Sequence, residues 1–203
     1  MPTLLSGESN SLTLMFGGKE VRVRFPEYDE NRRVTTPSQM LCIPGVTEST
    51  SKAFPQYVTC YKSMFSIVNQ VHSSSVAGLK GSGRNQLTDL VVFPARDPHN
   101  ASLAKMLGEG DPVDEISLLN LMWVKGKTPM ITSEFKFGKA KIITYKEARY
   151  FSACVFRCTE LLIKVNKFAQ ADGALEGTNE VKYNYAQLQP NNDLKATPQP
   201  ASA

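Results

Sequence analysis

Alternation of apolar and polar residues with a period of two is the sequence feature that most constrains the fold. Residues 21–25 (VRVRF) and 181–185 (VKYNY) follow this pattern. Successive side chains of a β-strand point to opposite faces, so the pattern indicates strands with one wet face. Aromatic and β-branched residues also concentrate at 40–46, 57–71, 87–93, 116–124 and 131–145, which is typical of strands. The chain is therefore predicted to be mostly β.

One short segment predicts a helix. Asn100 can cap residues 101–107 (ASLAKML), Leu103, Met106 and Leu107 fall at helical spacing, and Gly108 can end the helix. A helix of about two turns is marginal alone, so it must pack on something, most simply the end or side of a β-barrel. Residues 150–165 suit two strands, although TELLIKVNKF also contains helix-forming residues.

Three segments are predicted to be loops or tails. Ser73 to Gln86 contains three glycines and four serines, which is the composition of a mobile loop. Ala169 to Thr178 is polar and contains glycine, and from Gln189 onward the tail is rich in Pro, Ala and Asn. We expect all three to lie outside the regular strands.

Size and charge narrow the class of protein. A chain of 203 residues with 41% hydrophobic residues can bury one sizeable core. Its net charge of +4 comes without any long block of like charges, so it does not argue for nucleic-acid binding. The N-terminus lacks the pattern of a secretory signal, and no run approaches the ~18 apolar residues of a membrane helix. We expect a cytoplasmic chain with no membrane insertion.

No motif points to catalysis, a metal or a cofactor. Cys154 and Cys158 are spaced CxxxC, but only His72 and His99 could complete a zinc site, and neither stands at finger spacing. Together with Cys42 and Cys60, these cysteines are predicted to be buried free thiols. The glycines of residues 78–84 precede a predicted strand rather than a helix, so a phosphate-binding loop is disfavoured. We therefore expect that this chain is not an enzyme.

The order of elements around the helix is the distinctive feature of the middle of the chain. It runs GSGRNQL (81–87), a strand, Asp97, the short helix ending at Gly108-Glu109, and ISLLNLMWVKG (116–126). This order resembles that of the Hcp tube proteins of type VI secretion. MLCIPGVTES (40–49), FKFGKAKIITY (135–145) and NEVKYNYAQLQ (179–189) are similar to further strands of that family. The resemblance covers about residues 38–190, whereas residues 1–37 precede the usual start.

This resemblance implies a β-barrel of two packed antiparallel sheets with one short α-helix at the side. It implies that residues 1–37 form an N-terminal extension with one strand and that residues 38–190 form the barrel domain. Residues 191–203 would then be a flexible tail. The partner would be the chain itself, in hexameric rings stacked into a tube that carries effectors, with spike and sheath proteins. Such a protein would leave the cytoplasm without a cleavable signal peptide. Candidate contact residues between subunits or rings are Gly78, Leu79, Lys80, Arg84, Tyr183 and Tyr185.

Two other functions remain open at this stage. A viral structural or single-stranded nucleic-acid-binding β protein could use Arg22, Arg24, Arg32, Arg33, Lys80 and Arg84 on phosphates. Trp123 and the pairs Phe135/Phe137 and Tyr183/Tyr185 could stack on bases, but rings at i and i+2 of a strand more often pack a core or a subunit interface. An enzyme is the third possibility, and no motif supports it.

Overall fold

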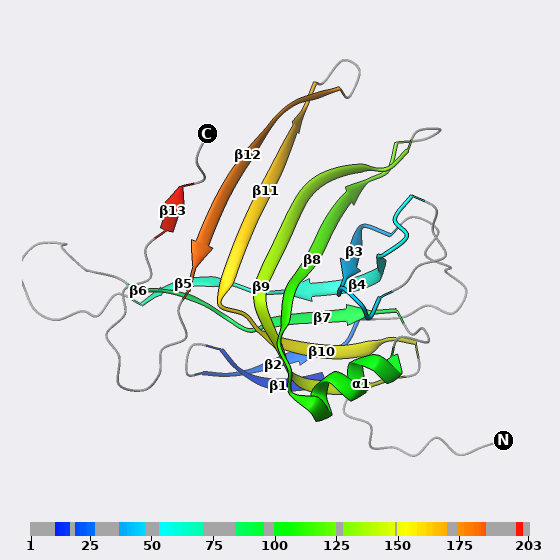
Figure 1. Ribbon diagram of the computed structural model, residues 1–203, viewed down its shortest axis with the longest axis vertical. Helices are drawn as coiled ribbons and strands as arrows, with labels where there is room; N and C mark the ends of the chain where they lie inside the picture. Colours follow the sequence, from blue (N-terminus) through cyan, green and yellow to red (C-terminus); the bar gives the residue numbers. More distant parts are fainter. Residues whose placement is uncertain are drawn as a thin grey trace, which may run out of the picture.

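The computed structural model describes residues 11–16, 19–26, 37–47, 53–70, 84–95, 100–124, 128–148, 150–169, 174–185 and 198–200. Within these ranges strands dominate, and one helix, α1 (Asn100–Glu109), lies at the side of them (Figure 1). This arrangement confirms the predicted mostly β class with a short side helix. No helix of the described part is long and apolar enough to cross a membrane.

The described strands follow one another along the whole chain. They are β1 (Ser11–Phe16), β2 (Lys19–Arg24), β3 (Gln39–Cys42), β4 (Val58–Met64), β5 (Ile67–Gln70), β6 (Arg84–Leu87), β7 (Leu90–Pro94), β8 (Val113–Met122), β9 (Met130–Glu147), β10 (Ser152–Arg157), β11 (Glu160–Phe168), β12 (Leu175–Asn184) and β13 (Pro198–Pro200). Every pairing between them is antiparallel.

Six strands close into a barrel. Their hydrogen-bonded order is β10-β7-β4-β3-β8-β9, and β10 also pairs with β9, so the ring of strands has no free edge. Strand β9 makes this possible through its length of 18 residues. Residues 141–147 of β9 pair with β10, whereas residues 133–138 pair with β11. Strands β11 and β12 therefore leave the barrel as a two-stranded flap (Figure 1).

The change of partner along β9 occurs at Gly138 and Lys139. Lys139 has φ 52°, in the left-handed region that few side-chain-bearing residues adopt. A Cβ at residue 138 would lie 2.9 Å from the Cβ of Glu160, and the backbone N–H of Thr159 donates to the Gly138 carbonyl at 3.2 Å. Glycine is therefore needed here because the start of β11 approaches the β9 backbone closely.

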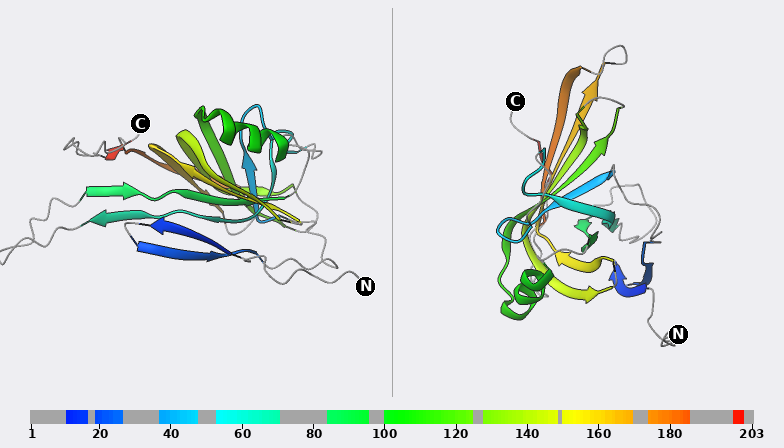
Figure 2. Two further views of the ribbon diagram at one scale, coloured as in Figure 1. Left: turned by 90° about the horizontal axis from the view of Figure 1, so that it is seen from below. Right: turned by 90° about the vertical axis from the view of Figure 1, so that its right-hand side faces the viewer.

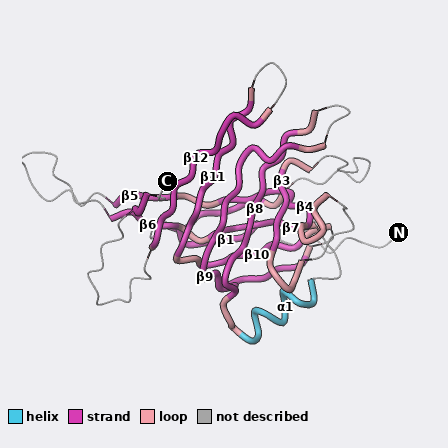
Figure 3. Tube along the Cα trace, turned by 45° about the horizontal axis from the view of Figure 1, so that its top comes forward, coloured by secondary structure: helices cyan, strands magenta, loops and turns pink. Residues whose placement is uncertain are grey.

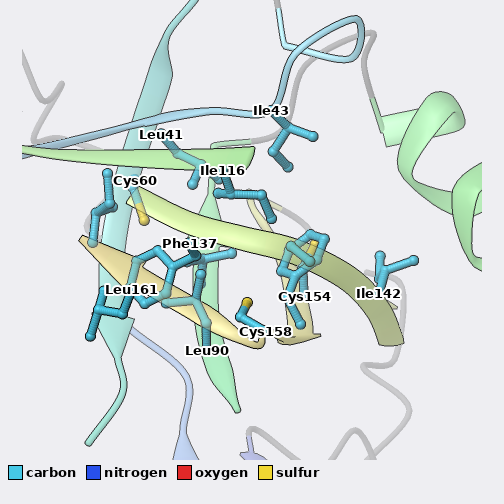
Figure 4. Close-up of a cluster of buried hydrophobic side chains, with 14 of the residues drawn as sticks. Leu41, Ile43, Cys60, Leu90, Ile116, Phe137, Ile142, Cys154, Cys158 and Leu161 are labelled. Atoms are coloured by element: carbon cyan, nitrogen blue, oxygen red, sulfur yellow. The ribbon is translucent and has the colours of Figure 1, made fainter. Parts of the chain in front are cut away.

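The barrel interior holds the main hydrophobic core. Leu41, Leu90, Ile116, Phe137 and Leu161 are all completely buried and come from five different strands (Figure 4). Phe65 packs edge-to-face on Phe135 and Phe137, with ring centroids 5.2 and 5.0 Å apart. The Phe135/Phe137 pair is thus a core pair, as the strand pattern favoured.

Helix α1 is held against the barrel by its apolar side. Leu103 is fully buried in the main core and Met106 packs beside it, whereas Leu107 is exposed. The helix runs one residue past Gly108 and ends at Glu109, in agreement with the expected end at Gly108-Glu109. Gly110 ends it, with φ 71° and an N–H that donates to the Met106 carbonyl at 2.9 Å.

Several predicted strand boundaries need correction. The segment 57–71 is broken between β4 and β5, and 87–93 falls in β6 and β7, which residues 88–89 separate. The predicted loop Ser73 to Gln86 is wrong at its end, because β6 begins at Arg84, and the rest of that loop lies outside the described residues. Residues 131–145 form one strand, β9, and residues 150–165 fall in two strands, β10 and β11, as favoured. The predicted loop 169–178 is wrong from Leu175 onward, because hydrogen bonds to β11 extend β12 into a polar segment.

The chain termini also differ from expectation. Instead of one strand, the N-terminal region forms a hairpin in which β1 pairs with β2 from Ser11↔Arg24 to Phe16↔Lys19. The alternation of Leu12 and Leu14 with polar residues was the overlooked signal for β1. At the other end, Pro198–Pro200 forms β13 along β12, where the composition predicted no strand. The division at residues 37 and 190 stays a prediction.

Candidate assembly interface

The flap formed by β11 and β12 carries an open strand edge. Strand β12 pairs with β11 along nearly its whole length, but on its other side only Tyr183, Lys182 and Val181 pair with β13. No described strand lies along the outer edge of residues 175–180 (Figure 1). Unpaired backbone groups on such an edge are a template for pairing with another chain. Since the barrel itself is closed, this edge belongs to the flap.

Exposed apolar side chains gather on the same protruding part. Val165 on β11 and Val181 on β12 are 44% and 39% exposed, and Leu175 is 60% exposed. On β11, Val165 points to the same face as Ile163 and the buried Leu161, because every second residue of a strand shares a face. On β12, Val181 lies on that same face because it pairs with Ile163. The apolar face of the barrel wall therefore continues onto the flap without a second layer that fully covers it.

The opposite face of β11 and β12, and of the neighbouring strands β8 and β9, is charged. The Lys136 ammonium lies 2.9 Å from a Glu115 carboxylate oxygen, and Lys164 lies 3.2 Å from Glu180. The hydrogen bond that the Lys136 ammonium donates to Glu115 is the largest cause that raises the pKa of Lys136, with burial opposing it. The flap thus has one polar face and one apolar face, and the apolar face is the one suited to a protein partner.

The end of β8 carries a second group of exposed apolar side chains, apart from those of the flap. Met122, Trp123 and Val124 are 42%, 40% and 38% exposed. The indole N–H of Trp123 donates to the carbonyl of Pro37 at 2.8 Å, so the ring is held in place on the surface. The end of β8 and the tip of the flap both lie at the far end of the sheet from α1 (Figure 3).

The β5–β6 arm extends the barrel on another side. Strands β4 and β7 continue into β5 and β6, which pair from Ile67↔Leu87 to Gln70↔Arg84 (Figure 2). Ile67 and Val68 are 38% and 36% exposed. The predicted contact residues Gly78, Leu79 and Lys80 lie outside the described residues, and Arg84 is placed only as the first residue of β6.

The predicted contact residues Tyr183 and Tyr185 lie together at the end of β12. Their rings are stacked, with centroids 5.7 Å apart and planes at 19°. Tyr185 is buried in the main core, and this burial raises the pKa of its phenol to about 12, with Tyr183 adding to the effect. Tyr183 is only partly buried and is the better placed of the two for an outside contact. Their contact role stays a prediction.

Val165 and Val181 were not among the contact residues predicted from the sequence. Each is a β-branched residue between polar residues, a pattern shared with strand residues that face a core. Of the arginines considered for phosphate contacts, Arg22 and Arg24 are exposed on β2, whereas Arg32, Arg33 and Lys80 lie outside the described residues. Among the described cations, Arg22 and Arg24 stand at i and i+2 of β2 and so share one face of that strand, whereas Arg84 begins β6.

The cysteines play no part in this interface. Cys42, Cys60, Cys154 and Cys158 are all free and buried, which confirms the predicted buried thiols. Burial raises the pKa of Cys60 and Cys158 to about 12 and also raises that of Cys154. Within the described residues, no group of three or more His, Cys, Asp or Glu side chains could hold a metal ion.

Solved structures share the fold of this chain, whereas comparisons of its sequence find no relative. No family model matches the chain, and no curated protein matches it. A solved type six secretion system protein matches with a TM-score of 0.64 and 16% identity, covering 73% of this chain and 96% of its own. Hcp1 from Salmonella typhimurium matches with a TM-score of 0.55 and 14% identity, over 72% of this chain and 93% of its own.

A third solved structure gives the same result at still lower identity. Hcp1 from the E. coli EAEC 042 pathovar matches with a TM-score of 0.53 and 7% identity, over 71% of this chain and 98% of its own. Each of these chains is covered almost completely, whereas more than a quarter of this chain has no counterpart in them. The chain therefore has an Hcp-like fold, carried by a sequence that has diverged far from the proteins sharing it.

Proposed function

We propose that this chain is a self-assembling tube subunit of a contractile secretion or injection apparatus, with an Hcp-like role in type VI secretion. The observation that carries the proposal is the flap. The barrel is closed, but the flap presents a strand edge and exposed valines on one face. Surfaces of this kind mark protein interaction sites. The likeness in fold to a type six secretion system protein supports the same role.

The geometry favours a ring over a simple pair of subunits. The apolar face of the flap and the wall of the barrel are different surfaces, so a contact between them is heterologous. Heterologous contacts that repeat through a rotation close into rings. We infer a hexameric ring, by analogy with the fold, and stacking of such rings into a tube through the β5–β6 arm. Effectors carried by the tube, spike and sheath proteins as partners, and export without a cleavable signal also belong to this proposal.

The proposed role assigns no chemistry to the chain. A tube wall needs edges, apolar contact surfaces and a stable barrel, all of which the flap, the arm and the core provide. We therefore propose that the chain acts as a structural protein and not as an enzyme. Residues 38–190 would form the ring-building domain, with residues 1–37 as an addition to it and residues 191–203 as a tail.

Sedimentation velocity over a concentration series tests the proposal. The wild-type chain should sediment as an oligomer, whereas the double variant Val165→Asp/Val181→Asp should sediment as a monomer of unchanged thermal stability. Charges on these exposed side chains oppose apolar contact without entering the core. Leu107→Asp is the matched control, because Leu107 is 38% exposed but lies on α1, away from the flap. A wild-type monomer at all concentrations, or equal effects of both variants, would refute the flap as the contact.

A further inference from the structure

The open edge of β12 at residues 175–180 is acidic. Glu176 and Glu180 stand four residues apart, so they share one face of the strand, and both are exposed. Glu180 ends a row of alternating charge across the flap, because Glu134 of β9 and Glu180 both lie directly opposite Lys164 of β11. Opposite charges on facing residues stabilise paired strands. A strand that joins this edge should therefore bring cations to the same face.

The hairpin β1–β2 presents an edge of the matching charge. β1 and β2 form a two-stranded sheet of their own, so within the described residues the outer side of β2 has no strand partner. Arg22 and Arg24 share the exposed face of β2, whereas Val23 points to the opposite face and is buried. Glu20 is the one acidic residue of β2. The Lys62 ammonium, which donates to the Arg24 carbonyl at 3.4 Å, adds positive charge beside this strand.

The hairpin is held on its own barrel, away from the flap. Val23 belongs to one buried cluster with Val91 and Phe93 of β7. Phe25, directly after β2, packs edge-to-face on Phe93 and Phe151, with ring centroids 5.8 and 5.6 Å apart. The hairpin lies at the opposite end of the molecule from the tip of the flap (Figures 1 and 2). A contact between β2 and the open edge of β12 therefore joins two copies of the chain.

We propose that β2 of one copy pairs with the open edge of β12 of the next copy, so that each flap adds to the hairpin of its neighbour. This step rests on the proposed function, because it names the surface that the flap meets. When the apolar side chains of both strands lie on one face, the arginines of β2 fall beside Glu176 and Glu180 on the other. The contact is heterologous, since one copy gives its flap and the other its hairpin, as a ring requires.

Length and charge distinguish β2 from the other described strands that have an edge outside the closed barrel. The open part of β12, residues 175–180, is as long as β2, which has six residues. Strands β1, β5 and β13 contain no charged residue, and β6 contains only Arg84. Two flap edges would place acidic residues against each other, which destabilises strand pairing. Among the described strands, β2 is therefore the partner whose charge and length fit the flap edge.

A mixture of two charge-reversed variants of the full-length chain tests the proposal. Arg22→Glu/Arg24→Glu makes both edges acidic, whereas Glu176→Lys/Glu180→Lys makes both edges basic. In sedimentation velocity, each variant alone should need a concentration about tenfold or more above that of the wild type to associate, because like charges then face each other. An equimolar mixture should associate as the wild type does, since every contact between the two variants joins opposite charges.

Lys105→Glu is the control for a change of charge, because Lys105 is 72% exposed on α1, and it should leave association unchanged. If a double variant unfolds at a lower temperature than the wild type, Arg22→Glu and Glu180→Lys repeat the test with one reversal each. A mixture that associates no better than its components, or variants that associate as the wild type does, would overturn this inference alone if Val165→Asp/Val181→Asp still abolishes assembly. A wild-type monomer at all concentrations would overturn the proposed function as well.

Discussion

Gly138→Ala should destabilise the barrel because no side chain fits where β9 changes partner. A Cβ at this position would lie 2.9 Å from the Cβ of Glu160, well inside the ~3.5–4.0 Å at which carbon atoms prefer to pack. The atom that must give way is next to the backbone of β11, so the strand itself has to shift. Overpacking of this kind costs about 1–3 kcal/mol.

The expected change is large enough to measure by thermal unfolding. In a protein of this size, 1 kcal/mol shifts the Tm by about 2–4 °C, so a cost of ~2 kcal/mol lowers it by about 4–8 °C. Circular dichroism at a concentration where the chain is monomeric would record it. Gly177→Ala is the control, since a Cβ there meets nothing within 4 Å, and it should change the stability by less than about 0.5 kcal/mol.

A second substitution tests the cause. Glu160→Gly removes the Cβ that the new methyl group would strike, so it should cost less in the Gly138→Ala background than in the wild type. The two changes should therefore be coupled by more than about 0.5 kcal/mol. A Tm for Gly138→Ala equal to that of Gly177→Ala, or strictly additive effects with Glu160→Gly, would refute the close approach as the reason for the glycine.

Four further outcomes are expected. Thiol counting in denaturant without reductant should return all four cysteines as free; a count of two or zero would reveal disulfides. Because burial raises the pKa of Cys60 from 9.0 to about 12, the unfolded chain loses this proton first, and stability should fall between about pH 9 and 12 by up to about 1.4 kcal/mol per pH unit. An equally steep alkaline loss in Cys60→Ala would contradict this. Replacing residues 76–84 by a short Gly-Ser turn should leave thermal unfolding unchanged and weaken stacking, whereas unfolding of the monomer would place the segment in the core. Single-stranded DNA should bind negligibly in fluorescence anisotropy; a steeply salt-dependent affinity would instead favour the nucleic-acid function.

The sequence predicted the positions of the strands better than it predicted which face of each strand is buried. Alternation identified β2 and the end of β12 because each has one polar side. In Leu90–Phe93 every residue is apolar, so no period reveals that two side chains point into the barrel and two point under the hairpin. The start of β12 is polar and was predicted as a loop, since its strand form depends on hydrogen bonds to β11 that composition does not encode.

The candidate interface was predictable only in part. The resemblance directed attention to Tyr183 and Tyr185, and the structure places both at the end of the flap strand, with Tyr185 in the core. Val165 and Val181 have the same local pattern as the buried Val23, which also stands between two polar residues. What makes them exposed is that the flap leaves the barrel at Gly138, which is a property of the topology and not of their own segment.

Negative-stain electron microscopy of the purified protein tests the central claim most directly. If the chain is a tube subunit, annular particles with a central channel should be visible, and stacked rings should form at higher concentration. Compact particles of the size expected for a single 22.4 kDa chain, at every concentration examined, would contradict the account.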